Sequence, residues 1–191
     1  MWDYREFLGE VLIDSETLQR RIQELGEQIS KDYEGKKLLL VCILRGGVMF
    51  LTDLMRSIRI PHAIEFMAVS SYGVGGRHSS GQVRITFDLN TDISEWDVIL
   101  VEDIIDSGHT LHSVLELLSI RQPKSLSVCA LLDKSERREV EIPLKYIGFE
   151  IPNKFVFGYG LDIDDFYRNL PFIGVVNLEK YNALIHQQEK E

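Results

Sequence analysis

The apolar segment KLLLVCIL, residues 37–44, constrains the fold more than any other part of this chain. After its first lysine every side chain is hydrophobic, so both faces of a strand made from it would be apolar. Such strands lie inside sheets that are covered on both sides, which is typical of parallel sheets flanked by helices. Further strand candidates follow at residues 63–69, 82–87, 98–101 and 125–132.

Helical patterns alternate with these strands. Between Ser15, a predicted N-cap, and Gly35, apolar residues recur at helical spacing at Leu18, Ile22, Leu25 and Ile29. Two more helices are expected, one after residue 47 and one over residues 110–120. Alternating strands and helices predict one α/β domain with a mainly parallel sheet, and 191 residues suit a single domain. The region from residue 145 is expected either to finish the sheet or to form a small flanking lobe.

The composition argues against several classes of function. Asp plus Glu is 30 and Lys plus Arg is 21, and the net charge of −9 disfavours non-specific binding to nucleic acid or an anionic membrane. No run approaches the ~18 apolar residues of a membrane span. The N-terminus lacks the basic and apolar regions of a signal peptide, so a cytoplasmic protein is expected. Cys42 and Cys129 lie in apolar runs and are predicted to be core thiols.

The loops richest in glycine and polar residues all follow predicted strands: LRGG, SSYGVGGRHSSG and EDIIDSGHT. Ligands of parallel sheets bind at the carboxyl ends of the strands, where such loops gather. We therefore expect the three loops to share one site. Neither a P-loop motif nor a dinucleotide-binding glycine motif is present, which disfavours the two commonest nucleotide folds.

The stretch VILVEDIIDSGHTL, residues 98–111, indicates what this site binds. At the start of the predicted helix, free N–H groups, the helix dipole and the hydroxyls of Ser107 and Thr110 make a cradle for phosphate. Glu102 and Asp103 can accept hydrogen bonds from sugar hydroxyls or bind magnesium. Together they predict a ribose phosphate site. The alternative is an acidic loop followed by a capped helix.

The same stretch resembles the phosphoribosyl pyrophosphate signature of type I phosphoribosyltransferases. GFEIPNKFVFGYGLDIDDFYRNLPFIGVV resembles the purine region of the hypoxanthine-guanine branch, ILRGG its pyrophosphate loop and SSYG its mobile catalytic loop. The four blocks lie in the family's order between residues 44 and 176. The resemblance implies a type I phosphoribosyltransferase fold over residues 1–191: a mainly parallel central sheet flanked by helices. A small hood lobe would comprise the N-terminal segment and the region from about residue 145.

The resemblance also implies roles for the acidic stretch. Glu102 and Asp103 would hold the ribose hydroxyls of the donor, 5-phospho-α-D-ribose 1-diphosphate (PRPP). Its 5-phosphate would bind the loop made of Asp106, Ser107, Gly108, His109 and Thr110. Serine at 107 replaces a threonine and keeps the hydroxyl, and the His109 side chain is expected to point to solvent. Asp106 would handle the N7 proton of a purine as general base or acid; the alternative is a turn or capping aspartate.

Two further loops acquire roles in the same way. Leu44, Arg45 and Gly46 match the pyrophosphate loop, whose backbone N–H groups contact the leaving group, and whose first peptide bond is often cis in the family. Arg45 replaces the lysine of some relatives, which keeps the charge and changes the geometry. Ser71 and Tyr72 match the catalytic loop that closes over the reacting centre and excludes water. The alternatives are a simple strand-to-helix turn and a disordered surface loop.

The C-terminal block supplies the predicted purine site. Lys134 would donate a hydrogen bond to the purine 6-oxo group, Phe155 would stack on the ring and the Val156 backbone would read its edge. Asp162 would hold a second magnesium ion beside the purine site, largely through water, and Arg168 would contact pyrophosphate. Core packing is the alternative for Phe155, and surface ion pairing for Asp162 and Arg168. Mg²⁺ is the expected cofactor, with Glu102, Asp103 and Asp162 as its candidate ligands.

The resemblance therefore implies purine salvage: hypoxanthine or guanine and PRPP would give IMP or GMP and pyrophosphate. The expected partners are these small molecules and further copies of the chain, as a homodimer or homotetramer, with no nucleic acid and no membrane. A nucleotide-sensing regulator with the same fold is the alternative from another class. The same chemistry on xanthine also remains open, because the purine 2-position is read by backbone atoms.

Overall fold

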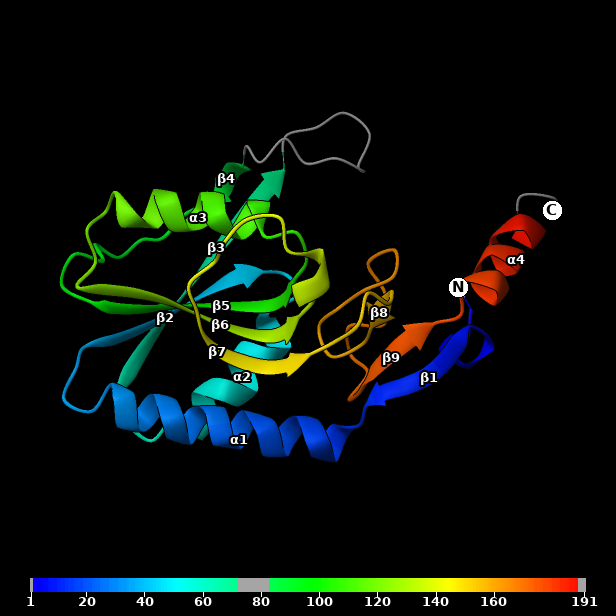
Figure 1. Ribbon diagram of the computed structural model, residues 1–191, viewed down its shortest axis with the longest axis horizontal. Helices are drawn as coiled ribbons and strands as arrows, with labels where there is room; N and C mark the ends of the chain where they lie inside the picture. Colours follow the sequence, from blue (N-terminus) through cyan, green and yellow to red (C-terminus); the bar gives the residue numbers. More distant parts are fainter. Residues whose placement is uncertain (1, 72–82, 189–191) are drawn as a thin grey trace.

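The structure is a computed structural model that describes residues 2–71 and 83–188. Its main sheet has six strands in the order β4-β3-β2-β5-β6-β7 (Figure 1). All neighbouring pairs are parallel except β3 with β4, which is an antiparallel edge strand. The bounds are β2 Leu38–Leu44, β3 His62–Ser71, β4 Val83–Phe87, β5 Asp97–Ile105, β6 Ser125–Asp133 and β7 Leu144–Glu150. The predicted α/β fold with a mainly parallel sheet is confirmed.

Strand β2 lies near the middle of this sheet, and its side chains alternate between two separate cores. Leu38, Leu40 and Cys42 pack with α1 (Ser15–Asp32) and α2 (Val48–Ser57) on one face. Leu39, Val41 and Ile43 pack with α3 (His109–Ser119) on the other face. Figure 1 shows α1 and α2 on the side of the sheet opposite to α3. A strand covered on both faces needs an unbroken apolar run, which explains residues 38–44.

Helix α1 begins with a different cap from the one predicted. The N-cap is Asp14, whose Oδ1 accepts a hydrogen bond from the backbone N–H of Thr17 at 2.8 Å, and Ser15 is already helical. The expectation for Ser15 was wrong because aspartate and serine cap helices about equally well, and here the aspartate comes first. Asp14 also places a negative charge at the positive end of the helix dipole. Both cysteines are free and buried, as predicted.

A second sheet joins the two ends of the chain. It has the order β1-β9-β8, all antiparallel, with β1 at Leu8–Ile13, β8 at Val156–Phe157 and β9 at Ile173–Val176. Helix α4 (Leu178–Gln188) follows, and an aromatic cluster around Phe7, Phe157 and Tyr181 fills the space beneath it. Figure 1 shows this sheet beyond the carboxyl ends of β5, β6 and β7.

The region from residue 145 therefore does both things that its sequence left open. Strand β7 completes the main sheet, whereas β8 and β9 belong to the second sheet. Among the described helices, none is both long enough and apolar enough to cross a membrane.

Candidate active site

The loop after β2 and the end of β5 meet at the carboxyl edge of the main sheet. The Leu44–Arg45 peptide is cis, as it often is in the resembled family. A Cβ atom added to Gly46 would lie 1.6 Å from Oδ2 of Asp103, so the backbone of this loop rests directly on the Asp103 carboxylate. Two of the three loops predicted to share one site are therefore in contact.

Glu102 and Asp103, which we call the β5 acids, carry carboxylates that are enclosed by their surroundings. Glu102 Oε2 is buried and has no hydrogen-bond partner. Burial raises the pKa of Glu102 well above its usual value, and the negative charge of Asp103 raises it further. Burial also raises the pKa of Asp103 to about 6, although the backbone N–H of Ile104 donates a 2.8 Å hydrogen bond to it. Burial outweighs the few groups that stabilise these charges, so hydroxyl donors or a cation would favour the charged pair.

The loop between β5 and α3 has the geometry of a phosphate cradle. Gly108 is the N-cap of α3 and has a left-handed backbone with φ of +90°. Because glycine has no side chain to cap the helix, the first N–H groups of α3 remain for a ligand. The Ser107 carbonyl accepts a 3.0 Å hydrogen bond from the backbone of Glu139, which ties this loop to the segment after β6.

His109 does not simply point to solvent, as its sequence position suggested. Its Nε2 atom lies 2.9 Å from a carboxylate oxygen of Glu139. Residues 135–140 therefore brace the cradle from outside, and Arg138 continues this contact by pairing with the buried Asp133 and packing against Gly108. The sequence reasoning missed these residues. Their one unusual feature in the sequence is the consecutive pair Arg137 and Arg138, which follows β6 by a few residues and by itself resembles solvated surface.

The predicted base and the predicted purine lysine lie together. Lys134 is only 7% exposed, and its Nζ atom lies 3.8 Å from Oδ2 of Asp106. The other carboxylate oxygen of Asp106 accepts a 2.9 Å hydrogen bond from Nε of Arg137. A buried lysine needs a polar partner, so Lys134 is poised between Asp106 and any acceptor that a ligand offers.

A turn at residues 158–168, which we call the C-terminal turn, closes the site from the side of the second sheet. A Cβ atom on Gly160 would lie 2.1 Å from the carbonyl oxygen of Gly46, so the two backbones touch. Tyr159 holds this contact in place, because its hydroxyl donates a 2.5 Å hydrogen bond to Asp53 of α2. Tyr159 and Gly160 both have a left-handed backbone, with φ of +49° and +99°. Sequence periodicity offered no signal for the Tyr159–Asp53 bond.

The two arginines predicted to bind pyrophosphate converge on this turn. Nη1 of Arg45 lies 2.9 Å from Oδ1 of Asp165, and Nη2 of Arg168 lies 3.4 Å from the same oxygen. Arg168 also pairs with Asp162 at 2.8 Å and donates a hydrogen bond to the Gly160 carbonyl. Arg45, Asp162 and Arg168 are thus brought together, around an aspartate that the sequence reasoning did not single out.

The residues predicted to bind the purine base differ in exposure. Phe155 is 46% exposed, so core packing, the alternative role for this aromatic, is excluded. Val156 is buried in β8, which pairs with β9. Ser71 ends β3, and its side chain and all of Tyr72 lie outside the described residues. The loop that would close over the site therefore stays a prediction.

The donor set around the β5 acids suits a cation that completes its coordination with ligand oxygens. In the described part of the chain, no three His, Cys, Asp or Glu side chains form a ready-made metal cage. Magnesium is usually held by one or two carboxylates together with substrate phosphates. The unpartnered oxygen of Glu102 and the enclosed carboxylate of Asp103 fit that mode.

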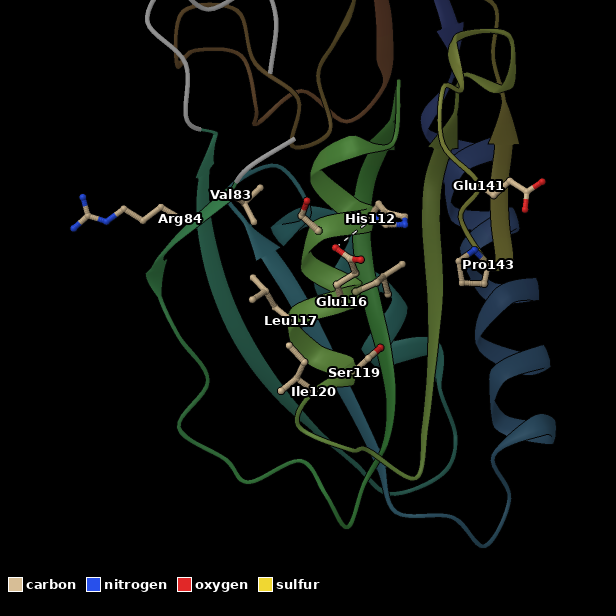
Figure 2. A pocket seen from close by; sticks show the side chains of 11 residues that line it. Val83, Arg84, His112, Glu116, Leu117, Ser119, Ile120, Glu141 and Pro143 are labelled. Carbon is tan, nitrogen blue, oxygen red and sulfur yellow. Dashed lines mark ion pairs between the residues drawn. The ribbon is translucent and has the colours of Figure 1, made fainter. Parts of the chain in front are cut away.

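A separate hollow of about 980 Å³ lies on the outer side of α3, away from these residues. Figure 2 shows it between β4 and the segment before β7, with His112 and Glu116 paired on the helix. Of the described residues predicted for the site, none lines this hollow. Its size therefore does not make it the reaction site, because the polar groups described above converge elsewhere.

Comparison with known proteins agrees with this geometry. The phosphoribosyl transferase domain family matches residues 12–164. The chain belongs to the phosphoribosyltransferase family. It is 50% identical over 171 residues to the hypoxanthine phosphoribosyltransferase of Escherichia coli, an alignment that covers 88% of this chain and 96% of that protein. It is 48% identical over 175 residues to the hypoxanthine-guanine phosphoribosyltransferase of Staphylococcus aureus, covering 92% and 97% of the two chains.

Solved structures of this family share the fold. A crystal structure of a Staphylococcus aureus hypoxanthine phosphoribosyltransferase superposes with a TM-score of 0.90 at 47% identity, covering 93% of this chain and 96% of the other. A hypoxanthine phosphoribosyltransferase from Trypanosoma cruzi, solved as a ternary substrates complex, superposes with a TM-score of 0.87 at 41% identity, covering 92% and 99%. The type I phosphoribosyltransferase fold is confirmed, and the protein is an enzyme of the transferase class.

Proposed function

We propose that this phosphoribosyltransferase acts in purine salvage: it transfers the 5-phosphoribosyl group of PRPP to N9 of hypoxanthine or guanine, giving IMP or GMP and pyrophosphate. One observation carries the proposal. A buried lysine, Lys134, and a carboxylate, Asp106, lie side by side next to a glycine-capped helix N-terminus. A 6-oxopurine offers a carbonyl oxygen for the lysine and a neighbouring N7 for the carboxylate. The names of the relatives support the same choice of base.

Each part of the donor has a complementary group in this site. The 5-phosphate would accept hydrogen bonds from the cradle made by Asp106 to Thr110 at the start of α3, while the ribose hydroxyls would donate to Glu102 and Asp103. Arg45 and Arg168 would take the pyrophosphate group together with the backbone N–H groups of Leu44 to Gly46. This division places each acid against a hydroxyl or a cation and keeps both β5 acids away from phosphate oxygens.

The purine would lie against the exposed ring of Phe155, with its edge facing the backbone of Val156. Lys134 would donate to the 6-oxo oxygen, which disfavours adenine because an amino group cannot accept that hydrogen bond. The 2-position of the purine would be contacted by backbone atoms, which the sequence does not specify. The assay below therefore has to distinguish guanine from xanthine.

Mg²⁺ is the cofactor proposed for Glu102, Asp103 and Asp162, the last through water. Bound there, the ion would neutralise the diphosphate and the acids at once and so assist departure of the leaving group. Its binding would also supply the positive charge that the enclosed β5 acids lack.

The chain's own residues would act mainly by positioning and electrostatics. As the bond from the anomeric carbon to pyrophosphate breaks, the carboxylates of Glu102 and Asp103 would stabilise the positive charge that develops on the ribose. N9 of the purine would then form the new bond to that carbon, and Asp106 would hold the N7 proton during the transfer. Ser71 and Tyr72 would close over this centre and exclude water.

The decisive experiment is a pyrophosphate-release assay with PRPP, Mg²⁺ and hypoxanthine, guanine, xanthine or adenine in turn. We expect release with hypoxanthine or guanine and none with adenine. Asp106→Asn should lower kcat at least about 100-fold while PRPP binding changes little, because a general base contributes that much in typical enzymes. Absence of release with every 6-oxopurine would overturn the proposal, and full turnover in the variant would remove Asp106 from the chemistry.

The alternative of a nucleotide-sensing regulator has weaker support. Such a protein would need a basic surface for nucleic acid, and the net charge is −9. RNA binding without base-dependent release of pyrophosphate would favour it over the enzyme. Cytoplasmic location and assembly into a homodimer or homotetramer stay expectations from the family resemblance, and size measurement in solution would test the assembly.

A further inference from the structure

The two arginines proposed for pyrophosphate already pair with a carboxylate of the chain itself. Asp165 places one carboxylate oxygen 2.9 Å from Nη1 of Arg45 and 3.4 Å from Nη2 of Arg168. Arg45 belongs to the loop after β2 and Arg168 to the C-terminal turn, so this single oxygen bridges two segments that are far apart in the sequence. Asp165 lies within the C-terminal block described above, but the family resemblance assigned it no role.

The turn that carries Asp165 directs its carboxylate toward these arginines. The Asp165 backbone is left-handed, with φ of +69°, and its N–H donates a 2.8 Å hydrogen bond to Oδ2 of Asp162. Paired backbone hydrogen bonds between Ile163 and Phe166 close the turn on both sides of it. Left-handed backbone is rare for residues other than glycine, and aspartate and asparagine are among the few that tolerate it.

The two ion pairs present a carboxylate where the leaving group of the reaction must bind. Guanidinium groups recognise carboxylates and phosphates through the same donors, so the two anions compete for Arg45 and Arg168. The side chains of Arg45 and Asp165 are 72% and 70% exposed, so their ion pair is weak enough to exchange with a ligand.

We propose that Asp165 is an internal substitute for pyrophosphate: its carboxylate holds Arg45 and Arg168 in the free enzyme, and pyrophosphate must displace it to bind. The inference rests on the proposed function, which assigns these arginines to pyrophosphate. Asp165 lowers the affinity for pyrophosphate by the fraction of time for which it occupies the arginines. The bridge therefore favours release of the product and keeps the two guanidinium groups aligned, and the diphosphate of the next PRPP must displace Asp165 in the same way.

The test is Asp165→Asn, which keeps the left-handed backbone and removes the charge. Asp164→Asn is the matched control, because Asp164 is adjacent, has φ of +52° and directs its carboxylate to the hydroxyl of Tyr181. Asp165→Gly, which also tolerates positive φ, removes the carboxyl group altogether. The measurements are calorimetric binding of inorganic pyrophosphate at constant Mg²⁺, and inhibition by pyrophosphate against PRPP.

We expect Asp165→Asn and Asp165→Gly to bind pyrophosphate about three- to tenfold more tightly, since the Asp165 carboxylate no longer competes for Arg45 and Arg168, while the pair of Arg168 with Asp162 remains. The KM for the purine should not change, and Asp164→Asn should match the wild type. If Asp165 only supported the turn, its variants would bind pyrophosphate equally or more weakly, which overturns the inference. Equal tightening in Asp164→Asn would also overturn it, because general charge would then be the cause. Absence of pyrophosphate release by the wild type would instead overturn the proposed function.

Discussion

The β5 acids and the acids of the C-terminal turn face the same site, yet the chain stabilises their charges to very different degrees. Glu102 and Asp103 are enclosed, and burial raises the pKa of both. Asp162 and Asp165 are more exposed, and each pairs with an arginine. Burial outweighs the hydrogen bond that Asp103 accepts and leaves Glu102 Oε2 without a partner, whereas the chain itself supplies an arginine to each acid of the turn. In the proposed reaction the first kind of carboxylate would serve hydroxyls and a metal ion, and the second would align the arginines for diphosphate.

The largest effect should come from pushing the C-terminal turn away from the loop after β2, which rests on Asp103. The two segments touch where the backbone of Gly160 meets that of Gly46. Gly160→Ala would place a Cβ atom 2.1 Å from the Gly46 carbonyl, at a φ of +99°, so the loop after β2 or the turn must move. We expect kcat/KM for PRPP to fall at least about 100-fold, because a displacement of 1 Å in a positioned site costs that much.

The control for Gly160 is Gly35→Ala. Gly35 also has a positive φ, +74°, but its added Cβ would meet no atom within 4 Å. This variant carries the conformational cost of about 1–2 kcal/mol without the collision. Activity close to that of the wild type in Gly160→Ala, or an equal loss of activity in Gly35→Ala, would show that the contact between the two backbones is unimportant.

A smaller effect is expected from removing one of the β5 acids. Asp103→Asn keeps the shape of the side chain but loses the charge, so kcat/KM for PRPP should fall by about 10- to 100-fold, as expected for a lost hydrogen bond to a charged group. Steady-state kinetics at several Mg²⁺ concentrations would measure it. A variant with unchanged kinetics at limiting Mg²⁺ would exclude Asp103 from the donor and metal site.

The same substitution should stabilise the fold at high pH. Burial raises the pKa of Asp103 from 3.8 to about 6, so the folded state holds this proton more tightly than the unfolded state. The wild type therefore loses stability as the pH rises from about 4 to 6, and Asp103→Asn does not. With Mg²⁺ removed, the variant should be more stable by about 1–3 kcal/mol above pH 6 and equal to the wild type below pH 4. Denaturant unfolding across this range would check the sign.

The smallest stability change is expected at the paired acids. Asp162→Asn removes an ion pair with Arg168 that is partly exposed, and its amide oxygen can still accept the hydrogen bond from the Asp165 backbone. The free energy of unfolding should change by less than about 1 kcal/mol. Denaturant unfolding at pH 8 would measure this change. A large gain in stability at pH 8 would mean that the charge of Asp162 is as unfavourable in the folded state as the charges of the β5 acids.

Strand β5 illustrates where reading the sequence succeeded and where it stopped short. The apolar run 98–101 predicted a buried strand, and the strand is present, but it continues through the two acids to Ile105. The extension is held by β6, whose residues pair with Glu102, Ile104 and Ile105. A local pattern treats charged residues as the end of a strand, because it contains no information about a neighbour that supplies hydrogen bonds.

The segment from residue 135 to 140 was missed for a related reason. Its arginines resemble an ordinary solvated surface in the sequence, since consecutive charges are common in loops. Their role depends on the return of the chain from β6 past the cradle, where Arg137 meets Asp106 and Glu139 meets His109. Only the paths of two loops through space bring these charges together.

The sequence alone determined the apolar strands, the order of strands and helices, and the glycine-bearing loops at the strand ends. These features depend on the periodicity of neighbouring residues, so hydrophobic burial and backbone geometry suffice to predict them. The tertiary structure decided which distant groups meet: the backbone of Gly160 lies on that of Gly46, and the Asp165 carboxylate lies between Arg45 and Arg168. The contacts of Gly160 with Gly46 and of Asp165 with Arg45 join residues more than 100 positions apart. Electrostatic pairing depends on distances that no local pattern records.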